Sequence, residues 1–213
     1  MPSSRIRTMT ASNAASKKAR ISNAEMSAQT QARILQATKE SLAEHGYAGT
    51  SMTGVAKRLG LTQPALSYHF DNKYQLMAAT AESIYDEMAA HFRAAAPESL
   101  TPQERILAFV EAAFEQTASV NQRALIELLL AARRDPRCHA VVEPVIERRD
   151  RGFQQFWADI VRAMPVNEQR MALLRDFAVS LYRGITVCRS LRGDDPTFAL
   201  QHAIVRSLVR DLL

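Results

Sequence analysis

The side chains with the clearest chemical potential lie between Ser51 and Phe70. Gln63, Ser67 and Tyr68 share the outer face of a predicted short helix, and their amide and hydroxyl groups are long enough to reach base edges and phosphates. A helix of this size fits the major groove of double-stranded DNA. The pattern therefore predicts a surface that recognises nucleic acid.

Two short helices must position these side chains. The sequence predicts one helix over residues 51–59 and another over residues 63–70, joined by a three-residue turn. Gly60 suits that turn because glycine adopts positive φ without steric penalty. Thr62 is a good N-cap for the second helix, and Pro64 is tolerated in its first turn. The segment is thus predicted to be a tight helix-turn-helix.

The rest of the chain predicts an all-α fold. From Ser27 onward the apolar spacing is helical, glycine is scarce at seven residues, and no stretch alternates as a strand would. Capping residues, glycines and prolines delimit nine predicted helices, with Pro144 expected to kink the seventh. They cover residues 27–45, 51–59, 63–70, 72–96, 101–120, 121–134, 136–164, 167–191 and 196–213.

The positive charge is concentrated near the N-terminus. Residues 1–75 contain ten lysines and arginines against four acidic residues, whereas the remainder has 17 against 18. All five lysines fall in that first third, which favours a polyanionic partner such as DNA. Residues 1–26 are poor in branched aliphatic side chains and are predicted to be a disordered basic arm. The alternative is a basic tail that only aids solubility.

Composition excludes several other classes of protein. The chain has two cysteines, Cys138 and Cys188, and neither a disulfide framework nor a thiolate zinc site is indicated. No apolar run approaches the ~18 residues of a membrane span, and the polar start lacks a secretory signal's apolar core. We therefore expect a cytoplasmic protein without membrane contact.

An enzyme finds little support in the sequence. No nucleotide-binding glycine loop, nucleophile elbow or His-Glu-x-x-His motif occurs, and the five histidines are scattered. Glu87 and His91 lie four residues apart on one helix face and could hold a metal, but a surface ion pair is the commoner outcome. We expect no catalytic residue, no metal and no cofactor.

An ordered pattern at fixed spacing runs through residues 31–76: Gly46 to Ser51, Val55-Ala56, Leu59-Gly60-Leu61, Gln63 to Leu66, His69-Phe70, Asn72-Lys73 and Leu76. In this pattern the segment resembles the TetR family of bacterial transcriptional regulators. The resemblance implies a homodimer that binds a near-palindromic operator through two helix-turn-helix domains and is released by a small molecule. The implied organisation is the arm (1–26), a DNA-binding domain of three helices (27–76) and a helical ligand-binding and dimerisation domain (77–213).

The same resemblance implies residue roles. Thr53 and Gln63 match positions that contact bases or the DNA backbone, while Tyr68, His69 and Lys73 match positions that grip phosphates. Ser67 departs from the tyrosine that the family often has there, so its phosphate contact would be shorter or water-mediated. The full predicted DNA-binding set is Ser51, Thr53, Thr62, Gln63, Pro64, Ser67, Tyr68, His69 and Lys73.

Individual members of this set have structural alternatives. His69 could be an interhelical histidine. Tyr68 is expected to be functional because its hydroxyl would otherwise be a buried donor without a partner. A lysine such as Lys73 near a helix N-terminus is unfavourable by dipole alone, which favours a bound phosphate there.

The C-terminal part carries two groups of large apolar side chains. The last two helices are apolar on more sides than one core requires, which predicts a two-fold interface between copies. Its candidate residues are Leu174, Phe177, Leu181, Ile204 and Leu208. An aromatic group either lines an effector cavity or is plain core, and its members are Phe92, Phe109, Phe114, Phe153, Phe156 and Trp157.

Together with the resemblance, these observations predict a ligand-responsive DNA-binding regulator that acts as a repressor. Its expected partners are double-stranded DNA, a small-molecule effector and a second copy of the chain. The alternative is a nucleoid-type protein that coats DNA through its basic arm without an inducer. Sequence specificity separates the two, since a regulator discriminates its site from random DNA by roughly 10³–10⁷.

Overall fold

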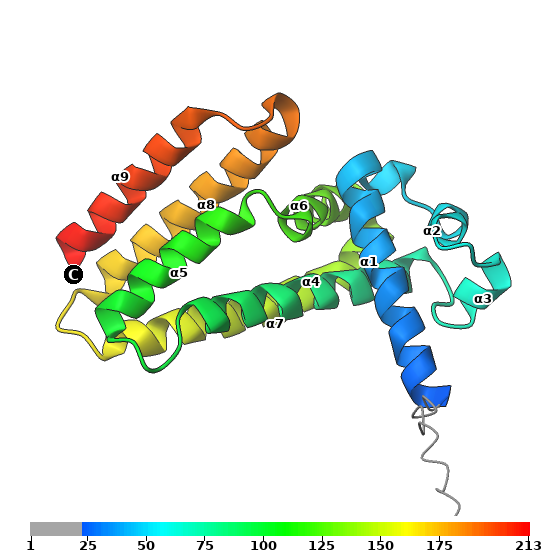
Figure 1. Ribbon diagram of the computed structural model, residues 1–213, viewed down its shortest axis with the longest axis horizontal. Helices are drawn as coiled ribbons and strands as arrows, with labels where there is room; N and C mark the ends of the chain where they lie inside the picture. Colours follow the sequence, from blue (N-terminus) through cyan, green and yellow to red (C-terminus); the bar gives the residue numbers. More distant parts are fainter. Residues whose placement is uncertain (1–22) are drawn as a thin grey trace, which may run out of the picture.

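The computed structural model describes residues 23–213, and all regular structure in this range is helical, which confirms the all-α class. The helices are α1 (Asn23–Gly49), α2 (Met52–Arg58), α3 (Gln63–Ser67), α4 (Lys73–Ala95), α5 (Pro102–Gln116), α6 (Val120–Ala132), α7 (Pro136–Arg162), α8 (Glu168–Arg192) and α9 (Pro196–Leu212). Helices α4 and α7 run side by side, with α1 to α3 at one end of this pair and α8 and α9 toward the other (Figure 1).

Side-chain caps begin the short helices where the sequence predicts them. Ser51 Oγ accepts from the backbone N of Gly54 at 3.0 Å, and Thr62 Oγ1 accepts from that of Ala65 at 3.3 Å. These bonds satisfy backbone donors that have no partner within the helix. Gly60 has φ +66° and makes the turn between α2 and α3, as expected.

Several boundaries differ from the predicted ranges. Helix α1 begins at Asn23, so residues 23–26 are helical rather than part of the predicted arm, whose residues 1–22 lie outside the described chain. Helix α3 ends at Ser67 instead of residue 70, because the chain then turns to bury Phe70 at 2% exposure. Helix α5 stops at Gln116, and Ser119 caps α6 through Gln122. Pro144 lies inside α7, which continues on both sides of it.

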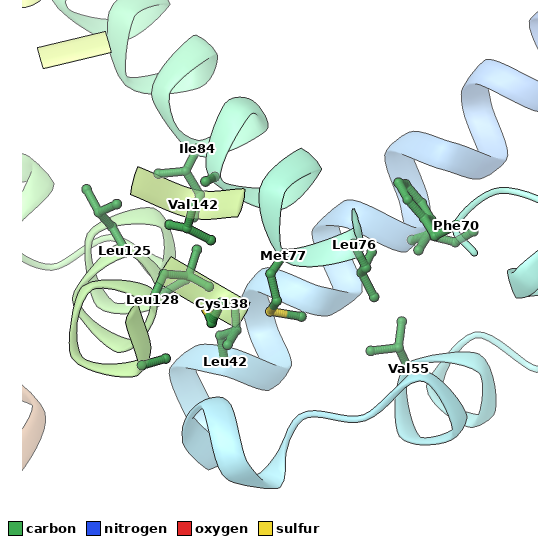
Figure 2. Close-up of a cluster of buried hydrophobic side chains, with 14 of the residues drawn as sticks. Leu42, Val55, Phe70, Leu76, Met77, Ile84, Leu125, Leu128, Cys138 and Val142 are labelled. Carbon is green, nitrogen blue, oxygen red and sulfur yellow. The ribbon is translucent and has the colours of Figure 1, made fainter. Parts of the chain in front are cut away.

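One apolar core joins the helix-turn-helix to the rest of the protein. Figure 2 shows Leu42 of α1, Met77 of α4, Leu128 of α6 and Cys138 of α7 gathered in one cluster. Val55 and Leu66, which lock α2 and α3 together, belong to the same core and are fully buried. Burial of these side chains fixes how α2 and α3 sit on α1 and α4.

A second core holds the opposite end of the molecule. It is built from α4, α5, α7, α8 and α9, and it includes Phe92, Phe109, Trp157 and Tyr182. Helix α4 contributes to both cores, through Ile84 to the first and Phe92 to the second. The predicted domain boundary after residue 76 therefore falls inside one continuous helix.

Polar contacts reinforce the junction between α1 and the later helices. Lys39 of α1 is 1% exposed, and its Nζ donates to Glu87 Oε1 of α4 at 2.5 Å. Asn121 of α6 donates to the other oxygen of Glu87 at 2.9 Å, and Tyr47 donates to Asp135 Oδ2 at 2.9 Å.

Among residues 23–213, no helix combines the length and apolar character that a bilayer crossing requires.

Candidate DNA-binding surface and effector cavity

The exposed face of α2 and α3 brings together two residues predicted to meet DNA. Thr53 and Gln63 come from different helices, and Thr53 Oγ1 donates to Gln63 Oε1 at 3.0 Å. Both side chains are exposed. Bidentate pairing of Gln63 with adenine needs both the oxygen and the nitrogen of its amide. On binding such a base, Gln63 would exchange the bond from Thr53 for one from DNA.

Tyr68 follows α3 directly and is the most solvent-exposed large apolar or aromatic side chain of the described chain, at 83%. This exposure agrees with the predicted outer face, and the Tyr68 hydroxyl is therefore not a buried donor in need of a partner. His69 is half-buried and meets the Tyr68 ring edge to face, with 5.3 Å between ring centroids. An exposed phenol directly after α3 agrees with the predicted phosphate contact, since hydroxyl groups commonly bind DNA phosphates.

The remaining small residues of the predicted set surround this face. Ser51 and Thr62 cap α2 and α3 with their hydroxyl oxygens, and the hydroxyl hydrogens remain available as donors. Pro64 and Ser67 are exposed on α3. The structure thus leaves these residues exposed on or beside α2 and α3.

Lys73 has protein partners that the sequence did not suggest. Its Nζ donates to the backbone oxygen of Tyr47 at 2.7 Å and lies 3.9 Å from the centre of the Tyr47 ring. Burial lowers the pKa of the Lys73 ammonium, although Cys138 and Asp135 partly oppose this effect. Lys73 therefore fastens the start of α4 to the end of α1, and a phosphate is not needed to explain its position.

Glu87 and His91 do not pair with each other in the described chain. Glu87 binds Lys39 and Asn121, while His91 Nε2 lies 3.5 Å from Glu115 Oε2. Burial tends to raise the pKa of the Glu87 carboxyl, but the hydrogen bonds from Lys39, Asn121 and Ser83 outweigh it and lower this pKa overall. Glu87 thus acts as a charged link between α1, α4 and α6.

A cavity of about 580 Å³ lies between α4, α5, α7 and α8. This volume is within the ~300–1,000 Å³ range of small-molecule sites. Five of the six predicted aromatic residues line it: Phe92, Phe109, Phe153, Phe156 and Trp157. Phe114 is not part of the lining. It stacks instead on the buried His202, with 4.2 Å between ring centroids.

Helices α8 and α9 expose an apolar face. Of the predicted interface residues, Phe177, Ile204 and Leu208 are 50%, 59% and 41% exposed, and Leu181 is partly buried. Leu174 does not belong to this face, because it is 8% exposed and packs in the second core. The predicted set omitted four exposed side chains of these helices, which are Leu173, Val187, Leu191 and Leu200. Helical spacing on α8 and α9 was the signal that could have found them.

Comparison with known proteins agrees with this architecture. The sequence model described as bacterial regulatory proteins of the tetR family matches residues 34–80. The HTH-type transcriptional regulator CymR of Pseudomonas putida is 27% identical over 142 residues, covering 67% of this chain and 70% of its own length. An uncharacterized HTH-type transcriptional regulator of Mycobacterium bovis is 29% identical over 137 residues, which are 64% of this chain and 68% of that protein.

Solved structures show the same fold. A TetR transcription regulator from Haloarcula marismortui superposes with a TM-score of 0.71 at 17% identity, covering 87% of this chain and 99% of that one. A TetR-family regulator from Rhodococcus has a TM-score of 0.70 at 15% identity, covering 86% and 98% of the two chains. Residues 34–80 therefore match the DNA-binding domain of the TetR family, and the described chain has the fold of TetR-family transcriptional regulators.

Proposed function

We propose that the protein is a ligand-responsive repressor that binds a palindromic operator as a homodimer. In this proposal Thr53, Gln63 and Tyr68 contact DNA, the apolar face of α8 and α9 joins two copies, and an effector in the cavity between α4 and α8 releases the operator. The protein has no catalytic role in it.

The observation that carries this proposal is the continuity of α4. Its first residue, Lys73, is bonded to Tyr47 beside the helix-turn-helix, and Phe92 near its other end lines the cavity. At 1.5 Å per residue these positions are roughly 30 Å apart along one helix. A ligand that shifts the cavity end of α4 therefore has a rigid element through which to move the DNA-binding helices.

Energetically, release requires an effector that binds one arrangement of the helices better than the other. Coupling of this kind typically amounts to about 1–3 kcal/mol, or roughly a 5–150-fold change in affinity. The Lys39–Glu87 pair and the Tyr47–Asp135 bond lie between the two sites and are suited to differ between the two arrangements.

Selection of bound duplexes from a random library tests the proposal. We expect enrichment of an inverted repeat, with half-sites in successive major grooves on one side of the duplex. Gln63→Ala should alter the enriched sequence, whereas Lys57→Ala, an exposed lysine on α2, should not. Binding without any enriched sequence would contradict the proposal and favour the nucleoid-type alternative.

A further inference from the structure

The cavity has an aromatic wall contributed by three helices. The rings of Phe92 and Phe109 stack with 4.5 Å between centroids, and Phe109 also meets Phe153 at 5.1 Å and Trp157 at 5.5 Å. Such a wall offers ring faces and edges to an apolar body but few polar partners. The main part of any ligand seated there is therefore hydrocarbon, either aromatic or alkyl.

Two buried polar atoms among the lining residues have no hydrogen-bond partner in the described chain. Trp157 is 3% exposed, and its indole Nε1 donor is unpaired. Oε1 of Gln116 is likewise buried without a donor. Unpaired buried polar groups are rare in folded proteins and often mark places where a ligand or water binds. The unpaired Nε1 donor of Trp157 therefore favours a ligand that carries a hydrogen-bond acceptor.

The charged lining is dominated by arginine, with five arginines against two aspartates. On α7, Arg148 pairs with Glu82 of α4, and Arg149 pairs with Glu82 and Asp86 of the same helix. These two guanidinium groups are therefore already neutralised by acids from outside the lining.

Arg175 of α8 is in a different situation. Its side chain is only 12% exposed, and it bonds through Nε and Nη2 to a single oxygen of Asp176, at 2.8 Å and 2.7 Å. Asp176 itself is 61% exposed, so water shares its carboxylate, and it holds the guanidinium through one oxygen only. The Nη1 group remains for a ligand. An enclosed guanidinium of this kind favours an incoming carboxylate.

We propose that the cavity binds amphipathic carboxylic acids, with the carboxylate held by Arg175 and the hydrocarbon body packed on the aromatic wall. This assignment rests on the proposed effector site. One carboxylate matches the single charge of Arg175, whereas a phosphate would bring up to two negative charges to a largely apolar cavity. The unpaired Nε1 of Trp157 donates to an oxygen of the same ligand.

Calorimetric titration of the full chain with matched pairs of compounds tests this assignment. The probes are 2-naphthoate, 4-phenylbutanoate and octanoate, each compared with its primary amide, which keeps the shape and removes the charge. We expect at least one acid to bind and to raise the thermal midpoint. Its amide should bind about tenfold to a hundredfold more weakly, as the loss of a charge-assisted hydrogen bond predicts.

Three variants locate the contact. Arg175→Gln should abolish the preference for acid over amide, and Arg175→Lys, which retains the charge but not the planar fork, should keep part of it. Arg170→Gln on the same helix is the control, because Arg170 is exposed and lies outside the cavity lining. This variant should bind acids and amides as the wild-type protein does. The comparison of each acid with its amide uses the wild-type protein, so its result does not depend on whether a variant folds.

Several results would overturn the assignment. These are an amide that binds as tightly as its acid, an acid whose affinity survives Arg175→Gln, or no binding by any of the three acids. DNA release is measured separately. An acid that binds through Arg175 and leaves operator affinity unchanged would contradict the proposed function while the ligand assignment stands.

Discussion

Gln63 and Lys73 are both predicted to meet DNA, but their surroundings differ. Gln63 is exposed and held only by Thr53, whereas Lys73 is half-buried against Tyr47. Replacing Gln63 by alanine should remove a base contact without touching the core. We expect Gln63→Ala to weaken binding to the best operator by about 1–3 kcal/mol and to relax base preference at one position of each half-site. Fluorescence anisotropy with single-base operator variants measures this, and unchanged preference would exclude Gln63 from base recognition.

Lys73→Ala should act on stability as well as on affinity. The change leaves the backbone oxygen of Tyr47 without its donor and frees the start of α4. We expect the free energy of unfolding to fall by about 1–2 kcal/mol, and operator affinity to fall alike for all sequences. Chemical denaturation and anisotropy titrations measure the two effects. Full stability together with an altered base preference would show that Lys73 reads bases instead.

Glu87 gives the folded protein an acid-sensitive link. Its pKa is lowered in the folded state, so the unfolded chain takes up the proton first as the pH falls. The stabilisation by the Glu87 carboxylate is thus present above its unfolded pKa, near 4.3. It is lost as the pH falls through the lower folded value.

Glu87→Gln should therefore destabilise the protein at neutral pH and flatten the acid dependence of its unfolding. We expect a loss of about 1.5–3 kcal/mol, because Lys39 stays buried after its charged partner is removed. Denaturation at pH 7 and pH 4 measures both changes. Glu98→Gln, in the exposed segment between α4 and α5, is the matched control. Equal stability of the two variants at pH 7 would show that the Lys39 link contributes nothing.

At the scale of the elements, the exposed apolar face of α8 and α9 is where we expect the second copy to bind. Phe177→Glu and Ile204→Glu alter side chains that are exposed in the single chain, so folding should be preserved. Each glutamate would bury an unpaired charge at the interface and oppose association by several kcal/mol. Light scattering should show dimers for the unchanged protein and monomers for the double variant.

A control keeps the dimer prediction specific. Leu130 on α6 is 48% exposed and does not belong to the α8 and α9 face. Leu130→Glu should therefore remain dimeric. If it too is monomeric, or if the unchanged chain is monomeric at micromolar concentration, the face of α8 and α9 is not the interface.

The elements themselves were largely predictable from the sequence, because caps and glycines act locally. Thr62 and Gly60 specify the turn and the start of α3 through their own backbone geometry. The end of α3 was not predictable in this way, since it depends on Phe70 reaching a core built from distant helices. For the same reason Leu174 was placed on the wrong side of α8, where neighbouring leucines look alike in sequence.

The candidate sites also divide into features set by local sequence and features set by the packing of distant helices. The exposure of the candidate DNA-binding residues could be predicted because the helix-turn-helix is a local arrangement. The aromatic side of the cavity was also predictable, apart from Phe114, from the clustering of large rings. Arg175 was not, because its enclosure arises only when α8 meets the other helices that line the cavity. Lys39 likewise reads as a surface residue until α1 meets α4.

For the whole molecule, α4 and the first core make the helix-turn-helix and the cavity parts of one packed structure. Changes in the cavity should then reach the DNA-binding end through α4 and the contacts of Glu87 and Tyr47. Because the coupling is reciprocal, operator DNA should weaken effector binding by the same factor by which effector weakens operator binding. Calorimetric titrations with and without operator measure this, and unequal factors would contradict a simple two-site coupling.

We propose that two copies of the chain recognise one specific DNA duplex. The direct test is the ratio of affinities for the selected operator and a scrambled duplex of equal length at one fixed salt concentration, together with the number of chains per duplex. We predict a ratio of roughly 10³ or more and two chains on each operator. A ratio near one, with the number of bound chains growing with duplex length, would contradict the account and show a protein that coats DNA.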